Sequence, residues 1–494
     1  MLKNKLSRIS VLLGALALGA CHDELLNPVP ESVLTSVNAF NTASDIDLAV
    51  LGVYSKYQDR LPRDYELMEM PSDNMYAFYF ATAPGIEEIT ALQVNPENAK
   101  INSFWKDTYN GIFRANSVLA NVDKPADYAE GKKDQYIGES KFMRALMYFD
   151  LVRIFGGVPK VTTVVTNEEA RTIGRASEDE IYQLIIDDLK DAVDKLPAPA
   201  AIAYGRASKA AAIALLAKVY VYRQNWAEAK TYLEKLFSDY SYSLVTNYGD
   251  LFEVATEKNS ETIFSIPYVA GTDGQGLTYA LAPIYGVKGV ISNGDRVARP
   301  TWDLHSSFEA GDTRFAVTIS EYQLTFNAKP GEQPYWYPYF NKWVVPSEPG
   351  SSGLDIPVLR LGDMILFYAE VLYHEGQAQA ALDQINRIRT RAFGNASHNY
   401  VLADIPDENA FLDKLLLERR LELAVENSRW FDLVRTGRYM TELAEYDAEY
   451  NPGSGTATKV QVNVQPYMKY FPIPWEQIQL SADGILQQNE GYAQ

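Results

Sequence analysis

The segment that decides the fold runs from Phe411 to Arg438. It reads Phe-Leu-Asp-Lys-Leu-Leu-Leu-Glu-Arg-Arg-Leu-Glu-Leu-Ala-Val-Glu-Asn-Ser-Arg-Trp-Phe-Asp-Leu-Val-Arg-Thr-Gly-Arg. Apolar residues recur at helical spacing, in one stripe of Leu417, Leu421, Ala424 and Val425 and in a second stripe of Leu412, Leu416 and Leu423. A helix that is apolar over so wide an arc is mostly buried, so we expect this segment to lie inside the protein.

Three acidic residues of this segment lie four positions apart, Glu418, Glu422 and Glu426. Like charges at that spacing destabilise an isolated helix, so their cations must come largely from elsewhere in the fold. The best candidates are the arginines of Ile-Asn-Arg-Ile-Arg-Thr-Arg, which are Arg387, Arg389 and Arg391, with Arg387 and Arg391 on one face. We predict two packed helices joined by a carboxylate–guanidinium network, since the planar fork of Arg binds carboxylates bidentately. The alternative is a catalytic carboxylate cluster, which we disfavour because every acid has a structural cation available.

The same segment carries a family resemblance. Glu418-Arg-Arg-Leu-Glu-Leu-Ala-x-Glu, followed by Arg429-Trp-Phe-Asp-Leu-Val-Arg-x-Gly, resembles the C-terminal signature of the SusD/RagB family. Further matching motifs, in the expected order, are Leu25-Leu-x-Pro at the start of the mature chain, Arg144-Ala-x-x-Tyr-Phe-Asp-Leu-Val-Arg-x-Phe-Gly-Gly-Val-Pro, Gly311-Asp-Thr-Arg, Tyr470-Phe-Pro-Ile-Pro and Gln488-Asn-x-Gly-Tyr. The resemblance therefore covers essentially the whole mature chain.

The resemblance implies a function. Members of this family are surface lipoproteins of Bacteroidetes that capture glycans, or in some cases peptides, for a TonB-dependent outer-membrane transporter. It therefore implies a glycan ligand, a SusC-like TonB-dependent transporter as partner, and a lid-like position over that barrel. Hydrolysis would be done by other proteins, so we expect no enzymatic activity and no cofactor.

The N-terminus is typical of a lipoprotein signal peptide, residues 1–20. Positive charges at Lys3, Lys5 and Arg8 precede a short apolar stretch, which is too short to span a bilayer. Leu-Gly-Ala-Cys21 then matches a bacterial lipobox, and Cys21 is the single cysteine of the chain. The alternative is an ordinary signal peptide with a chance cysteine. We expect lipidation of Cys21, a tether over 21–36, and an outer-membrane, cell-surface location.

Two segments resemble each other and predict tetratricopeptide-like helical hairpins, 217–229 and 369–381, because small residues recur at the same offsets around a turn. The alternative is two unrelated Ala-rich helices. We predict a mainly α fold in which such hairpins form a scaffold, with a long irregular region of loops and short strands and a small C-terminal extension. The expected division is an N-terminal helical region over 37–245 and a C-terminal region over 246–494, the latter including ligand loops within 270–350.

Composition and residue spacing exclude several functions. The net charge of −19 and the lack of any Lys/Arg-rich run disfavour nucleic acid as a partner. The four histidines show no metal-ligand spacing, so we predict no metal site. Glycoside hydrolysis needs two carboxylates at a set separation, and nothing in the sequence singles out such a pair.

Sugar binding needs exposed aromatic rings for the flat C–H faces of pyranoses and polar side chains for their hydroxyls. Two stretches offer both: Asp73-Asn-x-Tyr-x-Phe-Tyr, and Tyr335-Trp-Tyr-Pro-Tyr-Phe-Asn-Lys-Trp343, where prolines disfavour a regular helix. The predicted ligand-binding residues are Asp73, Asn74, Tyr76, Tyr79, Tyr285, Arg296, Trp302, Tyr335, Trp336 and Tyr337. The alternative is that these aromatics pack beneath the loops as a satellite core.

The sequence thus favours non-catalytic capture of an oligo- or polysaccharide and its delivery to the transporter. Peptide capture by the same machinery is the alternative, followed by a purely architectural lid and, last, an enzyme. A few aromatic stacks, each contributing about 1 kcal/mol, predict a dissociation constant between micromolar and millimolar.

Overall fold

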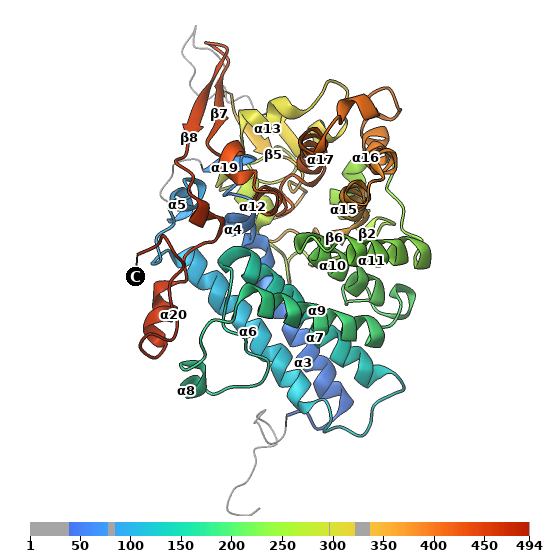
Figure 1. The fold of residues 1–494 in the computed structure, drawn as a ribbon, viewed down its shortest axis with the longest axis vertical. Helices are drawn as coiled ribbons and strands as arrows, with labels where there is room; N and C mark the ends of the chain where they lie inside the picture. Colours follow the sequence, from blue (N-terminus) through green and yellow to red (C-terminus); the bar gives the residue numbers. More distant parts are fainter. Residues whose placement is uncertain (1–38, 78–83, 296, 322–335, 494) are drawn as a thin grey trace, which may run out of the picture.

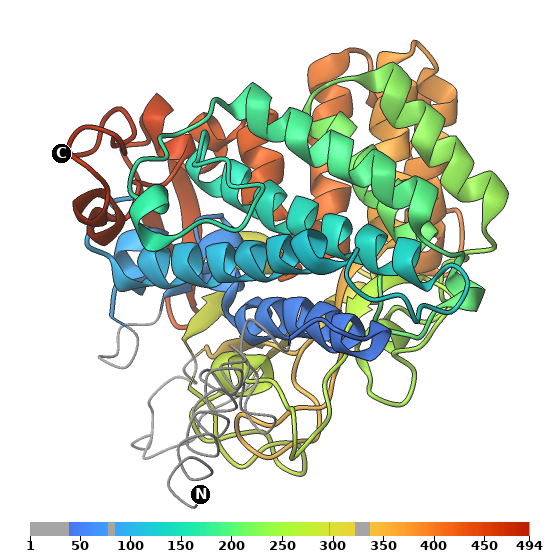
Figure 2. The same cartoon turned by 90° about the horizontal axis from the view of Figure 1, so that it is seen from below.

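The computed structural model describes residues 39–77, 84–295, 297–321 and 336–493. In the N-terminal half, long helices pack side by side (Figures 1 and 2). Helix α3 (Ala43–Arg60) packs against α6 (Ala99–Asn121), α6 against α7 (Lys132–Phe155), and α7 against α9 (Glu178–Lys195). Helix α7 is buried along most of its length, because neighbours cover it on several sides.

Two helical hairpins follow at one side of this layer (Figure 1). The first is α10 (Lys209–Tyr222) with α11 (Trp226–Asp239), and the second is α15 (Leu361–His374) with α16 (Ala378–Phe393). The hairpins contact each other through α11 and α15, although 121 positions separate these helices in the chain. The buried alanines of α10 let neighbouring helices approach closely. The predicted scaffold of helical hairpins is confirmed.

The region between the hairpins is irregular and contains short strands, as predicted, but it also contains short helices that the sequence did not indicate. The short elements are β2 (Thr262–Ile266), α12 (Leu277–Leu281), β3 (Ala298–Pro300), α13 (Trp302–Ser307), α14 (Arg314–Thr318), β4 (Ile319–Glu321), β5 (Pro338–Phe340) and β6 (Ile356–Arg360). Antiparallel pairs join β1 (Met75–Ala77) to β3, β2 to β6, and β4 to β5. These pairs tie loops from distant parts of the chain to one another.

The C-terminal part contains α17 (Glu408–Leu423), α18 (Arg429–Arg435), α19 (Tyr439–Glu442) and α20 (Trp475–Leu480). Strands β7 (Glu445–Asn451) and β8 (Thr456–Gln461) form an antiparallel hairpin that projects from the body (Figure 1). The remaining short elements are η1 (Leu61–Arg63), α4 (Tyr65–Met68), α5 (Ile86–Thr90), α8 (Asn167–Ala170), η2 (Pro199–Ala201), η3 (Tyr248–Phe252), η4 (Leu402–Asp404) and η5 (Pro466–Lys469). None of the helices within the described ranges is long and apolar enough to cross a membrane.

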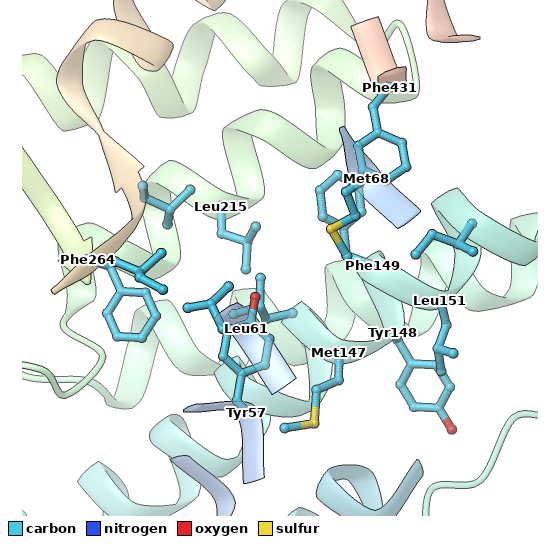
Figure 3. Packing of buried hydrophobic residues seen from close by; sticks show 14 of the residues in the cluster. Tyr57, Leu61, Met68, Met147, Tyr148, Phe149, Leu151, Leu215, Phe264 and Phe431 are labelled. Carbon is cyan, nitrogen blue, oxygen red and sulfur yellow. The ribbon is translucent and has the colours of Figure 1, made fainter. Parts of the chain in front are cut away.

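One apolar core joins the two halves of the chain. Figure 3 shows residues of α3, η1 and α4 packed with α7, and Leu215 of α10, Phe264 of β2 and Phe431 of α18 complete the cluster. All of these side chains are buried. The C-terminal signature segment thus packs on the first helices of the protein.

The predicted carboxylate–guanidinium network is present and buried. Glu418 accepts hydrogen bonds from Arg389 (3.0 Å) and Arg314 (2.6 Å). Glu422 accepts from Arg391 (2.5 Å), Arg360 (2.6 Å) and Arg314 (3.3 Å). These cations hold the pKa of Glu422 well below its usual range despite burial, so the carboxylate is ionised. The structural interpretation of this acidic cluster is therefore supported.

Two details of that prediction are wrong. Arg387 does not join the network: its side chain points to solvent and donates to Gln384. Helix α17 ends at Leu423, so Glu426 lies in the turn beyond it and not on the same helical face. Glu426 pairs there with Lys342 (2.9 Å) and Arg360 (2.7 Å). The unforeseen cations, Arg314, Lys342 and Arg360, all come from the irregular region, where no periodicity shows which side chains point inward.

Candidate ligand-binding site

Aromatic rings from three distant segments meet where helix α13 contacts strand β7. Trp302 and His305 lie on α13, Trp336 precedes β5, and Tyr450 lies on β7. Figure 1 shows α13 beside the β7–β8 hairpin at one end of the molecule. We call these four residues the aromatic cluster.

Trp302 is the centre of the cluster. Tyr450 stacks on it with ring centroids 3.9 Å apart and an interplanar angle of 11°, and His305 stacks on it at 4.6 Å and 17°. Two rings stacked on the same face of Trp302 would contact each other, and His305 and Tyr450 do not. They therefore cover opposite faces of Trp302. Within the described residues no ring stacks on the other face of Tyr450, which is only half-buried.

Trp336 supports the stack from its edge. Its ring lies nearly perpendicular to Trp302 (5.4 Å, 82°) and it is only 7% exposed. Glu321, at the end of β4, holds the arrangement together through one carboxylate oxygen. That Oε1 atom accepts a hydrogen bond from Trp336 Nε1 (3.0 Å) and lies 2.8 Å from His305 Nε2. The indole orientation is thus fixed by a charged acceptor and two packed rings.

The start of α13 is fixed by the loop that precedes β1. Thr301 caps the helix, because its hydroxyl accepts from the backbone N–H of Leu304 (3.1 Å). The Thr301 hydroxyl also donates to the carbonyl oxygen of Asp73 (2.6 Å), and the Thr301 N–H donates to the carbonyl oxygen of Asn74 (3.1 Å). Residues 73–74 therefore determine where Trp302 lies.

Asp73 and Asn74 are themselves buried and fully engaged within the protein. Asp73 forms a bidentate pair with Arg429 (2.8 Å for each bond), and Asn74 accepts from Arg420 (2.8 Å) and donates to Glu69 (2.6 Å). Burial raises the pKa of Asp73, but Arg420 and Arg429 outweigh it and lower that pKa to about 2. Both residues were predicted to contact the ligand directly. In the structure, their bonds to Arg420, Arg429 and Thr301 instead position the start of α13.

Glu69 connects this loop to the turn after α17. Its carboxylate accepts from the backbone N–H groups of Val425 (3.0 Å) and Ser428 (3.2 Å). Val425 has a φ of +61°, which is unfavourable for a β-branched residue, and Asn427 has a φ of +60°. Burial raises the pKa of Glu69 to about 7. The strained turn is thus held by an acid from the loop that precedes β1.

The other predicted residues fall into different environments. Tyr337 is buried, with the Arg299 guanidinium 4.2 Å above its ring, so it belongs to the core beneath the loops. Tyr76 is half-buried on β1, opposite Arg299 of β3. Tyr285 is 52% exposed and is not one of the rings packed on the aromatic cluster. The predicted sites Tyr79, Arg296, Tyr335 and Cys21 lie outside the described residues.

Sequence reasoning missed two residues of the cluster, His305 and Tyr450, and also Glu321, which bonds to it. His305 follows Trp302 by three positions, which places both on one helical face, but the six-residue helix α13 is too short to show a periodic pattern. Tyr450 ends the alternation Tyr446, Ala448, Tyr450 before a Pro-Gly turn, and that pattern could have identified the hairpin.

A concave surface lies apart from the aromatic cluster, between α6, α8 and α20, with a cavity volume of about 920 Å³. Its rim includes Phe113, which is 47% exposed, and Leu480. Trp105 and Tyr109 in its wall pack on each other and belong to the core side. Over the described ranges, no three His, Cys, Asp or Glu side chains gather closely enough to hold a metal ion.

Comparison with known proteins gives two family matches. Residues 260–492 match the family model described as the SusD family, and residues 26–221 match one described as starch-binding associating with outer membrane. SusD-like protein P25 of Formosa agariphila is 26% identical over 93% of this chain and 94% of that protein. The starch-binding protein SusD of Bacteroides thetaiotaomicron is 23% identical over 86% of this chain and 84% of that protein.

The solved structure of a laminarin binding SusD-like protein has the same fold. It superposes with a TM-score of 0.73 at 26% identity, covering 92% of this chain and all of that one. Its helical scaffold therefore corresponds to the one described above along nearly the whole chain.

Proposed function

Since this chain belongs to the SusD/RagB family, we propose that it captures a glycan at the aromatic cluster without catalysing its cleavage. The observation that carries the proposal is the stack of His305, Trp302 and Tyr450, which leaves one face of Tyr450 uncovered by any described ring. A ring held rigidly from behind can receive the C–H face of a pyranose without reorganising, which lowers the entropic cost of binding.

The likeness to proteins named for binding starch and laminarin supports this class of ligand. The partly exposed Asp303, Glu321 and Glu449 lie beside the cluster and offer acceptors for sugar hydroxyl groups. We further propose that Cys21 is lipidated at the outer membrane and that the bound glycan passes to a partner TonB-dependent transporter. The family match described as associating with outer membrane supports that location.

The experiment is affinity electrophoresis of residues 22–494 through gels that contain laminarin, starch, xylan or galactomannan. We expect at least one polysaccharide to retard the wild type and Tyr450→Ala to migrate as it does in a plain gel. Phe113→Ala is the matched control, because it removes an exposed aromatic ring from the concave surface between α6, α8 and α20. Retention that is lost in Phe113→Ala and kept in Tyr450→Ala would place the site in that other cavity. Lack of retention by any polysaccharide would refute glycan capture.

A further inference from the structure

The charged groups around the aromatic cluster are distributed unevenly between surface and interior. Asp303, Glu321, Glu442 and Glu449 have side chains that are between 35% and 46% exposed. The arginines paired with Glu449, Asp303 and Glu442, which are Arg299, Arg420 and Arg429, are 6% exposed or less, and His305 beside Glu321 is 16% exposed. A ligand approaching the cluster therefore meets carboxylates first, while the guanidinium groups lie beneath them.

The buried guanidinium groups are already committed to interactions inside the protein. Arg420 donates to Asp303 (2.7 Å), to Asn74 (2.8 Å) and to the carbonyl oxygen of Asp73 (2.8 Å). Arg429 forms its bidentate pair with Asp73. A carboxylate or sulfate on a glycan is recognised best by an Arg fork with free N–H groups. The Nε and both Nη atoms of Arg420 and the Nε and Nη2 atoms of Arg429 already donate inside the protein.

The β7–β8 hairpin also carries net negative charge. Strand β7 carries Glu445, Asp447 and Glu449, and Lys459 of β8 pairs with Glu445. Over the two described strands of the hairpin, the acidic residues therefore outnumber the single lysine.

We propose, on the premise that the aromatic cluster binds a glycan, that this site selects uncharged glycans and rejects those that bear carboxylate or sulfate groups. Carboxylates can accept hydrogen bonds from sugar hydroxyl groups, so they favour a neutral chain. They repel an anionic chain by about 1 kcal/mol for each close charge pair in water, and the protein's net charge of −19 acts in the same direction. Asp303 and Glu449 thereby act as specificity-determining residues.

The test compares polysaccharides of opposite character by affinity electrophoresis at low and high salt. The neutral set is laminarin, starch, xylan and galactomannan, and the anionic set is alginate, polygalacturonate and carrageenan. We expect retention by one or more neutral polysaccharides, unchanged between 20 mM and 500 mM NaCl, because such binding involves no charge on the ligand. Every anionic polysaccharide should bind at least about tenfold more weakly at low salt, which corresponds to one or two repulsive pairs.

Two double variants test whether the charges at the aromatic cluster or the net charge of the whole protein set the specificity. Asp303→Asn/Glu449→Gln removes two acids at the cluster and exposes positive charge on Arg420 and Arg299, so it should gain retention by anionic polysaccharides. Asp123→Asn/Glu130→Gln removes the same charge at the exposed loop between α6 and α7, and it should gain none.

The outcomes are distinguishable. Strong, salt-sensitive retention of the wild type by an anionic polysaccharide would overturn this inference while leaving glycan capture intact. An equal gain in both charge variants would also overturn it, because net charge and not Asp303 and Glu449 would then set the specificity. Lack of retention by all seven polysaccharides, in every variant, would overturn glycan capture and this inference together.

Discussion

Replacing Glu422 by Gln tests whether the buried ionic network holds the C-terminal half of the fold. The Glu422 carboxylate receives three guanidinium groups, from Arg360 (2.6 Å), Arg391 (2.5 Å) and Arg314 (3.3 Å), and it is fully buried. Gln has a similar shape, but it is neutral and presents N–H groups toward cations. In the variant, these three guanidinium groups lose one of the buried negative charges that neutralise them.

Breaking a buried ion pair by removing one partner costs about 3–5 kcal/mol, and we expect a loss of this size in the free energy of unfolding. An unfolding entropy of about 2.1 cal/mol/K per residue gives about 1 °C of Tm per kcal/mol for a chain of 494 residues, so Tm should fall by about 3–5 °C. Urea unfolding followed by circular dichroism would measure the free energy, and differential scanning calorimetry would measure Tm.

Asp413→Asn is the matched control on the same helix. Asp413 pairs with Arg438 at 2.9 Å, but its side chain is 62% exposed, so its removal should cost less than about 1 kcal/mol. The reasoning would be refuted if Glu422→Gln destabilised the protein no more than Asp413→Asn. In that case the network would be replaceable by neutral hydrogen bonds, and burial of charge would not be what orders α17.

Three further predictions address the positioning loop, a turn and the core. The pKa of Asp73 (about 2) lies below the ordinary 3.8, so its ionised form stabilises the fold above pH 3.8, and this contribution of about 2–3 kcal/mol is lost as the pH falls to 2. The difference in unfolding free energy between wild type and Asp73→Asn should therefore shrink over that range, and a constant difference would contradict the assignment. Gly286→Ala should destabilise the protein by about 3 kcal/mol, because φ is +67° and a Cβ would lie 2.1 Å from the carbonyl oxygen of Ile291. Gly289→Ala, with φ +79° and open space around it, should lose only about 1 kcal/mol in the same urea titration. Equal losses would show that the turn at Gly286 relaxes. Leu215→Ala should lose about 2–5 kcal/mol through the cavity left in the core of Figure 3, and a loss below 1 kcal/mol would mean that the helices around α10 collapse onto the gap.

The helical scaffold could be predicted because it is encoded locally. Repeated small residues predicted both hairpins, and the acidic ladder of α17 required buried cations, two of which were identified as Arg389 and Arg391. Arg387 was assigned wrongly because helical spacing shows that residues share a face, but not which neighbour that face contacts.

The candidate site was harder to predict because its residues meet only through tertiary contacts. Trp302 and Trp336 were identified by residue type, but their partners His305 and Tyr450 lie in a six-residue helix and in a hairpin more than 100 positions away. Asp73 and Asn74 were selected by type as well, since polar residues before an aromatic strand have the composition of a binding loop. Their arginine partners, Arg420 and Arg429, are about 350 positions distant, and local sequence gives no sign of that pairing.

The most direct test of glycan capture at the aromatic cluster is isothermal titration calorimetry with a hexasaccharide of the retained polysaccharide. We predict a dissociation constant between micromolar and millimolar for residues 22–494, the same value for Phe113→Ala, and a value raised about tenfold for Tyr450→Ala, since one lost ring contact contributes about 1–1.5 kcal/mol. An unchanged dissociation constant in Tyr450→Ala, with both variants folded by circular dichroism, would contradict the placement of the ligand on this ring.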